Sequence, residues 1–203
     1  MDIILVAIFS YLSGSIPFGL ILTKIFGKID IRKIGSGNIG ATNVLRTGNK
    51  YLAATTLGLD ILKGYVPVLI CVKYFPELIE LSSLLVLLGH IFPLWLKFKG
   101  GKGVATYLGV VTALSIPLSL LFIFTWIVVL LIFKYSSLSS MFASLTVLVV
   151  NLIREIFIST NSILISKQVP DTKILFIFFI LIVFSHRKNI SNLKNKTESK
   201  IKI

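Results

Sequence analysis

Long apolar runs alternate with short polar segments along most of the chain, and this pattern predicts helices that cross a membrane. The runs are rich in Leu, Ile, Val and Phe and reach membrane-spanning length, whereas the two-residue alternation of a membrane strand is not seen. We therefore expect an all-α polytopic membrane protein with a single integral-membrane domain over residues 1–203.

Seven transmembrane helices are expected, two of which share one apolar run. That run, Val104–Phe133, fits the length of one tilted helix or of two short helices hinged near Pro117. Two helices are preferred, because a single one would place the basic C-terminal tail outside the cell. Five helices, with the short pair uninserted or re-entrant, are the alternative. The other expected spans are Ile3–Leu22, Leu52–Val72, a span that ends with Leu84–Leu96, Met141–Ile158 and Ile174–Ser185.

Composition and charge set the orientation. Only 14% of the 203 residues are charged, against about 25% in a soluble domain. The net charge of +13 comes from 21 Lys and Arg against 8 Asp and Glu, and the basic residues lie mostly in loops. This is typical of cytoplasmic loops and of contact with anionic lipid headgroups, not of nucleic-acid binding, and it places the N-terminus outside and the C-terminus in the cytoplasm. The first residues lack the basic region of a cleaved signal peptide, so we expect a mature first helix. A single cysteine, Cys71, excludes a disulfide within the chain.

The segment Gly35–Asn49, here called the first glycine loop, interrupts this apolar pattern most strongly. It contains four glycines interleaved with asparagines, threonines, Ser36 and Arg46. Glycines allow backbone N–H groups to approach a ligand, successive N–H groups can bind an anion, and an arginine adds a bidentate contact for phosphate. The segment therefore suggests a phosphate site; a flexible linker is the alternative, and no Walker sequence follows.

A second glycine loop, Lys97–Gly103, follows the third apolar run and contains the sequence GGKG. Lys102 offers a point charge for phosphate, and the next helix should begin at about Val104, with its N-terminus towards the loop. Alone, GGKG is more typical of a basic turn at the headgroups. Positive-inside topology places both glycine loops, the loop expected at Tyr135–Ser140 and the tail His186–Glu198 on one face, which favours anion binding.

Several polar residues within the apolar runs are further candidates. Asp60 and Lys63 lie at i, i+3 and can pair, either as functional residues or as a buried pair that holds helices together. The segment Ser13–Gly19, with Pro17, favours close helix packing over a ligand site. His90 is a possible general base, although a structural hydrogen bond is slightly favoured.

The remaining chemistry is sparse. His186 and Asn189 share a helix face, and Asn189 offers both a donor and an acceptor. Two distant histidines and one cysteine do not form a zinc site, so we expect no metal and no cofactor. The sequence contains neither a Gly-x-Ser-x-Gly turn nor the His-x-x-x-x-Asp pair of acyl-CoA-dependent glycerolipid acyltransferases.

Taken in order and spacing, six segments resemble the bacterial acyl-phosphate-dependent glycerol-3-phosphate acyltransferases: SGSIPFG, GSGNIGATNVLR, DILKG, GHIFPLWLKFKGGKGVAT, KYSSLSS and HRKNI with KTESK. The resemblance runs from about Ser13 to Glu198. It implies seven helices in the bacterial plasma membrane, an active site on the cytoplasmic face, and no covalent acyl-enzyme. The implied reaction transfers a fatty acyl group from acyl phosphate to glycerol 3-phosphate, giving 1-acyl-glycerol 3-phosphate (lysophosphatidic acid) and phosphate. This transfer does not use CoA and is the first step of phospholipid synthesis.

The resemblance also implies site residues. Those expected to be catalytic are Ser36, Arg46, Lys102, His186 and Asn189. Those expected to bind substrate or phosphate are Gly35, Gly37, Asn38, Gly40, Thr42, Asn43, His90, Gly100, Gly101, Gly103, Ser137, Ser140 and Glu198, with Glu198 also bracing the tail and the choice between the two serines left open. Lys188 stands where an acidic residue is common in the family, and Lys196 stands where a glycine is common.

Two other functions would also use some of these residues. A transporter or channel for phosphorylated anions would use the same basic loops, but it would place polar residues on broken helices at mid-membrane, whereas here only Asp60 and Lys63 lie there. A non-catalytic membrane scaffold would explain neither glycine loop. The expected partners are acyl phosphate, glycerol 3-phosphate and membrane lipids; the oligomeric state and acyl-chain preference are not predicted.

Overall fold

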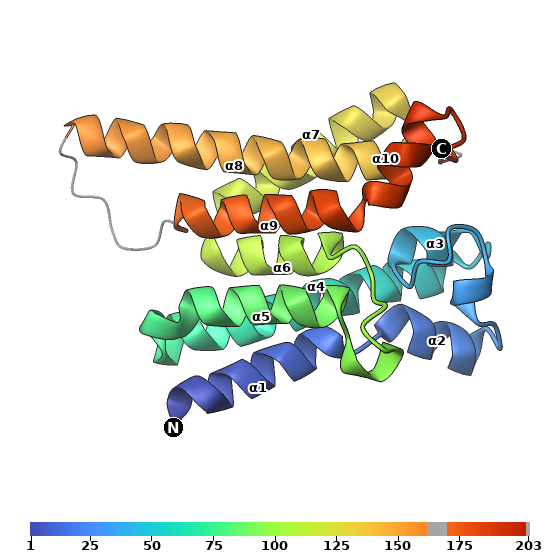
Figure 1. Cartoon of the computed structure of the whole chain (residues 1–203), viewed down its shortest axis with the longest axis horizontal. Helices are drawn as coiled ribbons and strands as arrows, with labels where there is room; N and C mark the ends of the chain where they lie inside the picture. Colours follow the sequence, from blue (N-terminus) through green and yellow to red (C-terminus); the bar gives the residue numbers. More distant parts are fainter. Residues whose placement is uncertain (162–169, 202–203) are drawn as a thin grey trace. The chain divides into compact units, whose positions relative to one another are not determined.

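The computed structural model describes residues 1–161 and 170–201, and all regular elements within these ranges are helical (Figure 1). The predicted all-α class is therefore confirmed for the described residues. The chain forms two compact units, Met1–Ala113 and Leu114–Ile203, which are described separately. That the chain is a single domain remains a prediction.

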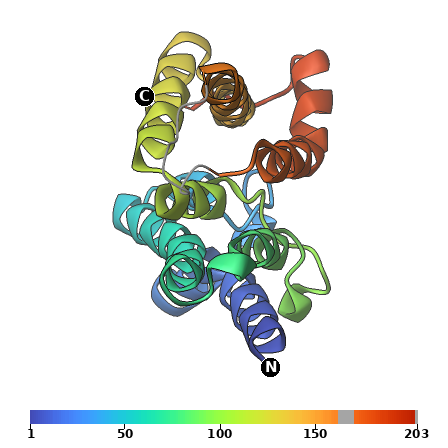
Figure 2. The ribbon, with the colours of Figure 1, turned by 90° about the vertical axis from the view of Figure 1, so that its left-hand side faces the viewer.

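The first unit contains most of the candidate residues. Helices α1, α4 and α5 pack side by side in it (Figure 1 and Figure 2). Glycines permit this packing, because a Cβ on Gly14 would overlap the backbone of Val86 and a Cβ on Gly89 would overlap that of Tyr11. Its elements are α1 (Asp2–Ser15), α2 (Phe18–Phe26), η1 (Ile31–Lys33), α3 (Ala41–Leu45), α4 (Lys50–Tyr74), η2 (Pro76–Leu78), α5 (Ile79–Ile91), η3 (Leu94–Leu96) and α6 (Val104–Leu114).

The first apolar run is not the continuous helix predicted over Ile3–Leu22. It breaks between α1 and α2, which meet with a bend of 42°. Ile16 is extended, with φ −66° and ψ 117°, because the ring of the following Pro17 disfavours helical geometry at the residue before it. The third run likewise ends its α-helix at Ile91, before Pro93, and not at Leu96.

The run Val104–Phe133 forms two helices, as predicted. The break lies at Ser115, which is extended, and Pro117 occupies the first turn of the second helix, where its missing N–H is not needed. This second helix, α7, begins the second unit.

In the second unit, α8 packs against both α7 and α9. Its elements are α7 (Ile116–Phe133), α8 (Ser136–Asn161), α9 (Thr172–Ser185) and α10 (Arg187–Lys194). The loop predicted over Tyr135–Ser140 is wrong from Ser136 onwards, because α8 begins at Ser136. Ser139 and Ser140 fit within the helix by donating their hydroxyl hydrogens to the carbonyls of Tyr135 and Ser136. The outer loop predicted over Ser159–Lys173 falls largely on 162–169, outside the described residues.

Four helical segments among the described residues are long and apolar enough to cross a membrane: α4, α7, most of α8, and α5 with its two flanking 3₁₀ turns. The number rises to six if α1 with α2 and α9 with α10 each count as one bent span, and α6 is a shorter apolar helix. An integral membrane protein is therefore indicated, as the sequence predicts.

Candidate functional site

The first glycine loop is anchored to the first unit by buried aliphatic side chains. Ile39 and Val44 are buried in a cluster with Leu20 of α2, Ile31 of η1 and Ala53 of α4. A flexible linker would leave such side chains exposed, so the linker interpretation is excluded. The loop is therefore a folded element carried by α2 and α4.

A single buried amide, that of Asn43, organises the backbone of this loop. Its Oδ1 accepts from Ser36 N at 3.1 Å. Its Nδ2 lies 3.1, 3.0 and 2.8 Å from the carbonyl oxygens of Ile31, Ile34 and Asn38. These contacts use the amide inside the loop, so Asn43 shapes the loop and does not present its side chain to a ligand.

The polar residues predicted to hold phosphate lie around this hub. Gly35 and Gly37 have φ of +53° and +71°, the left-handed region that favours glycine. The Arg46 side chain lies over Gly35, since a Cβ there would come within 2.8 Å of Arg46 Cδ and 3.0 Å of Nη1. Ser36 is exposed beside Gly35. The loop therefore brings the Arg46 guanidinium and the Ser36 backbone to the same exposed surface.

The other predicted residues of this loop have local roles. Asn38 Oδ1 accepts from Gly40 N at 2.9 Å, which forms an Asx turn before the short helix α3. Thr42 is exposed on α3. The turn that precedes the loop contains a bidentate ion pair, in which Arg32 Nε and Nη2 donate to Asp30 at 2.9 and 2.6 Å. These hydrogen bonds hold the pKa of the Asp30 carboxyl well below its usual range and raise the pKa of Arg32.

The second glycine loop folds back onto the end of α5. Gly100 N donates to Ile91 O and Gly101 N donates to His90 O, both at 3.0 Å. A Cβ on Gly100 would overlap the His90 carbonyl, and a Cβ on Gly101 would overlap His90 Nε2. The first two glycines of GGKG are therefore required by packing against α5. The sequence suggested an anion cradle at these positions, but the amides of both glycines bond the protein itself.

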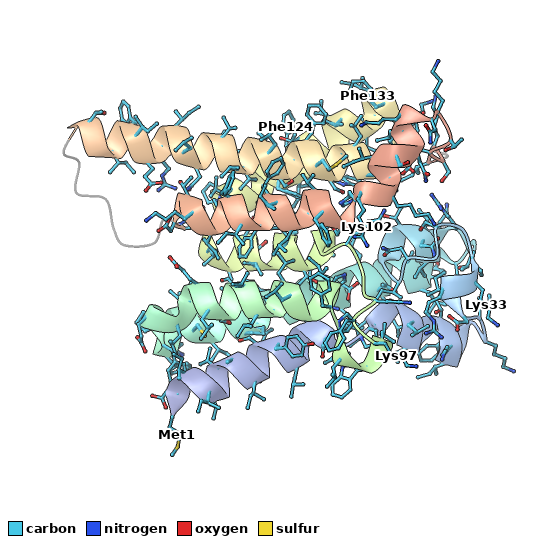
Figure 3. The ribbon with its side chains drawn as sticks, in the orientation of Figure 1. Met1, Lys33, Lys97, Lys102, Phe124 and Phe133 are labelled. Carbon is cyan, nitrogen blue, oxygen red and sulfur yellow. The ribbon has the colours of Figure 1, made fainter. Side chains whose placement is uncertain are left out.

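The last two residues of GGKG lead into α6. Gly103 has a φ of +81°, and its carbonyl accepts from Tyr107 N at 2.7 Å in the first turn of the helix. Lys102 immediately precedes this glycine. Figure 3 shows Lys33, Lys97 and Lys102 towards the end of the first unit that is opposite Met1.

Both glycine loops meet in one hydrophobic cluster. Leu96, the residue immediately before the second loop, packs against the cluster that contains Ile39 and Val44 of the first. The two loops therefore lie at the same end of the first unit. This part of the predicted shared face is found within one unit.

His90 makes the structural hydrogen bond that the sequence slightly favours. It is buried, and its Nδ1 is hydrogen-bonded to Thr106 Oγ1 at 3.0 Å, with the tautomer deciding which group donates. Its ring also seats Gly101. These contacts leave it inside the fold, where it supports the second loop.

In the second unit, Glu198 gathers the residues predicted in the tail. Its Oε1 accepts from Asn189 Nδ2 at 2.6 Å and from Ser137 Oγ at 2.9 Å. Its Oε2 accepts from Asn192 Nδ2 at 3.2 Å. Glu198 thus joins the start of α8 to α10, as a brace should, and Ser137 is part of that brace.

Ser140 and His186 have different surroundings. Ser140 Oγ accepts from Trp126 Nε1 at 3.1 Å, which fastens α7 to α8. His186 lies at the bend of 57° between α9 and α10, and its Nδ1 is 2.8 Å from Ile182 O. Since a carbonyl only accepts, Nδ1 carries the hydrogen. His186 and Asn189 therefore lie on α10 and its cap and not on the end of one straight helix.

Asn192 was not identified from the sequence, and Lys63 was identified without its contact to the first apolar run. Asn192 lacks any motif of its own, and only its spacing of three residues from Asn189 could have suggested a shared face. Lys63 Nζ donates to Ile16 O at 2.7 Å, a contact with the broken first run that depends on tertiary structure.

Comparison with known proteins gives a consistent result. The family model described as glycerol-3-phosphate acyltransferase matches residues 4–196. The glycerol-3-phosphate acyltransferase of Pelagibacter ubique (strain HTCC1062) is 54% identical over 203 residues, which cover 100% of both chains. That of Mesorhizobium japonicum is 52% identical over 200 residues, covering 98% of this chain and 96% of the relative. The crystal structure of PlsY (YgiH), an integral membrane glycerol 3-phosphate acyltransferase, in its glycerol 3-phosphate form has a TM-score of 0.86 at 35% identity, covering 100% of this chain and 96% of that one. Its lysophosphatidic acid form has a TM-score of 0.85 at the same identity and coverage.

Proposed function

The chain belongs to the glycerol-3-phosphate acyltransferase family, and from this premise we propose that it uses acyl phosphate as the acyl donor. The products are then 1-acyl-glycerol 3-phosphate, that is lysophosphatidic acid, and inorganic phosphate. The proposal rests on two basic, glycine-containing loops at one end of the first unit. Ile39 and Val44 of the first loop and Leu96, just before the second, pack in one hydrophobic cluster there. Donor, acceptor and both products carry phosphate, so two neighbouring cationic loops suit this reaction.

The reaction requires little covalent help from the protein. The glycerol hydroxyl oxygen attacks the acyl carbonyl carbon, the carbon–oxygen bond to phosphate breaks, and the hydroxyl proton passes to the departing phosphate. Atoms and charge balance without CoA, metal or cofactor. An acyl phosphate is a mixed anhydride and is already activated, so positioning and charge stabilisation can supply most of the catalysis.

The residue roles follow from chemistry and position. Arg46 is suited to a bidentate phosphate contact, with Ser36 beside it, and Lys102 provides a second cation. Asn43 and His90 hold the two loops in shape. Whether the first loop holds the phosphate of the donor or that of the acceptor is left open.

The tail residues of the second unit complete the assignment. Asn189 Nδ2 donates to Glu198, and the bond of Nδ1 to Ile182 O orients the His186 ring. We infer that both side chains contact substrate and that Glu198 positions Asn189.

The topology is part of the same proposal. Seven helices, with the N-terminus outside and the C-terminus in the cytoplasm, place both glycine loops on the cytoplasmic side of the bacterial plasma membrane. Basic residues dominate these loops, in accordance with the positive-inside rule. The cytoplasmic side is also where glycerol 3-phosphate would be available.

A phosphate-release assay tests the proposal. Purified protein given palmitoyl phosphate and glycerol 3-phosphate should release phosphate without CoA. Arg46→Ala or Lys102→Ala should each lose about 2–4 kcal/mol of transition-state stabilisation, which lowers turnover roughly thirtyfold to a thousandfold. Lys33→Ala, an exposed cation of the same unit, is the matched control and should remain active. Strict dependence on acyl-CoA would refute the donor, and uptake of labelled glycerol 3-phosphate into proteoliposomes without acylation would favour transport.

A further inference from the structure

An ion pair lies buried in the middle of α4 and takes no part in the proposed acyl transfer. Lys63 Nζ and Asp60 Oδ1 are 2.7 Å apart, and the two side chains are only 2% and 3% exposed. Burying two charges is expensive, so such a pair persists where further contacts compensate it. Lys63 contacts residues that support the first glycine loop, and Asp60 lies near a residue that supports the second.

Lys63 contacts the break in the first apolar run. Lys63 Nζ donates to Ile16 O at 2.7 Å, at the extended residue between α1 and α2. Ser13 Oγ donates in turn to Lys63 O at 3.3 Å. The ammonium also lies 5.6 Å from the centroid of the Phe18 ring, within the range of a cation–π contact. Lys63 therefore fastens both sides of the break to α4.

The break controls the first glycine loop through α2. A Cβ on Gly19 would overlap the Ile39 carbonyl, so the backbone of α2 lies directly against this loop. Leu20 of the same helix joins Ile39 in the buried cluster. A change in the angle between α1 and α2 at Ile16 would therefore move α2. Because Ile39 packs on α2, the first glycine loop around Ser36 would move with it.

Asp60 lies near His90, which supports the second glycine loop. Asp60 Oδ1 lies 4.0 Å from His90 Nδ1, which is hydrogen-bonded to Thr106 in the first turn of α6. His90 O accepts from Gly101 N, and its ring fills the space that a side chain on Gly101 would need. His90 thus holds the second loop at Gly101 and the helix that follows it at Thr106.

We propose that the Asp60–Lys63 pair positions both glycine loops from one turn of α4. Lys63 holds the α1–α2 break by its hydrogen bond to Ile16 O, and the Asp60 carboxylate acts electrostatically on the buried His90 ring, 4.0 Å away. This inference rests on the proposed function for its kinetic consequence, but its structural part stands independently. Asp60 and Lys63 are positioning residues, because neither reaches the exposed loop surface.

The test replaces both charges together. In the double variant Asp60→Val with Lys63→Met, apolar side chains of similar volume replace the pair, a change that folds are often able to tolerate. Hydrogen exchange should accelerate by about tenfold or more at Gly37 and Arg46 in the first loop and at Gly100 and Gly101 in the second, since local opening becomes easier. In the same variant, KM for glycerol 3-phosphate should rise by about tenfold, with a smaller change in kcat, because substrate positioning is lost.

Two further variants separate positioning from general damage. Ser10→Ala removes the buried 2.8 Å hydrogen bond between Ser10 of α1 and Ser82 of α5. It should leave hydrogen exchange in both glycine loops and KM unchanged. Thr106→Val, nearly identical in shape, should accelerate exchange at Gly100 and Gly101 but not at Gly37. It tests the support of the second loop by His90 even if the double variant does not fold.

The outcomes are distinct. In the double variant, unchanged exchange at Gly37 would overturn the Lys63 branch, and unchanged exchange at Gly101 would overturn the Asp60 branch. Unchanged exchange at Gly101 in Thr106→Val would overturn the support of the second loop by His90. Faster loop exchange in Ser10→Ala as well would show a general loss of stability and would overturn positioning. If the unmodified protein fails to use acyl phosphate, the proposed function fails, while the exchange measurements still decide the positioning proposal.

Discussion

Gly101→Ala distinguishes two explanations of the GGKG sequence. If Gly101 is a glycine so that its backbone can approach a phosphate, the damage from a methyl group should not depend on His90. The structure instead places Nε2 of His90 where the methyl group would lie, with Cε1 and Cδ2 within 2.9 and 3.0 Å of it. Shortening His90 should therefore relieve the effect of Gly101→Ala.

The expected magnitudes can be worked from these contacts. Overpacking a buried site typically costs about 1–3 kcal/mol, which we assign to Gly101→Ala. His90→Ala alone loses its hydrogen bond with Thr106, a net contribution of about 0.5–1.5 kcal/mol, and leaves a cavity that adds to the cost. In the double variant the methyl group enters that cavity. The two effects should then fall short of additivity by about 1–3 kcal/mol.

Thermal unfolding of the four proteins in one detergent measures this coupling. For a chain of this length, each kcal/mol corresponds to roughly 2–4 °C in Tm. The double variant should therefore unfold several degrees above the temperature expected from adding the two single losses. Strictly additive losses in Tm would refute the packing explanation and restore the requirement for a close approach by phosphate.

Further predictions concern the charged and amide groups. Arg46→Lys should retain part of the activity but raise KM, because a lysine cannot make a bidentate phosphate contact, as steady-state kinetics will show. Asn43→Ala should lower stability by about 1–3 kcal/mol because Ser36 N and Asn38 O lose their hydrogen bonds to this amide. Asn43→Asp should not restore the bond to Asn38 O, because the aspartate has no NH₂; thermal unfolding measures both. Glu198→Gln should lower Tm by several degrees, since its three donors lose a charged acceptor whose hydrogen bonds are worth about 1.5–3 kcal/mol each. The lowered pKa of Asp30 means that its pair with Arg32 stabilises the turn above the usual carboxyl pKa of about 4 and is lost only in more acidic solution. An NMR titration should accordingly show no change in this turn between about pH 5 and 9.

The sequence predicts the helical architecture well because apolar runs of membrane-spanning length carry a strong signal. The division of Val104–Phe133 into two helices follows from the basic C-terminal tail through the positive-inside rule, and Pro117 marks the approximate position of the hinge. Local features do not predict the structure where the same residues are compatible with two of them, such as a kinked and a broken helix, or a loop and a helix. Pro17 was compatible with a kinked helix, and the break became evident only with the Ile16 carbonyl bonded to Lys63 from another helix. Ser136–Ser140 looked like a loop because serines favour turns, but their hydroxyls bond carbonyls within α8.

In the candidate site, too, some features can be predicted from the sequence and others depend on tertiary contacts. The basic character of the two loops and the bracing role of Glu198 could be anticipated from residues and resemblance. The reasons for individual residue types could not, because Asn43 serves the loop backbone and Gly101 serves His90, and both reasons depend on neighbours that only the fold supplies.

The choice of acyl donor tests the central claim most directly. Purified protein in proteoliposomes, given labelled glycerol 3-phosphate with palmitoyl phosphate, palmitoyl-CoA or palmitoyl-acyl-carrier protein in separate reactions, will show which donor is used. Labelled lysophosphatidic acid should form with palmitoyl phosphate alone, together with one equivalent of inorganic phosphate. Labelled product formed from palmitoyl-CoA or from the carrier protein, with none from palmitoyl phosphate, would contradict it.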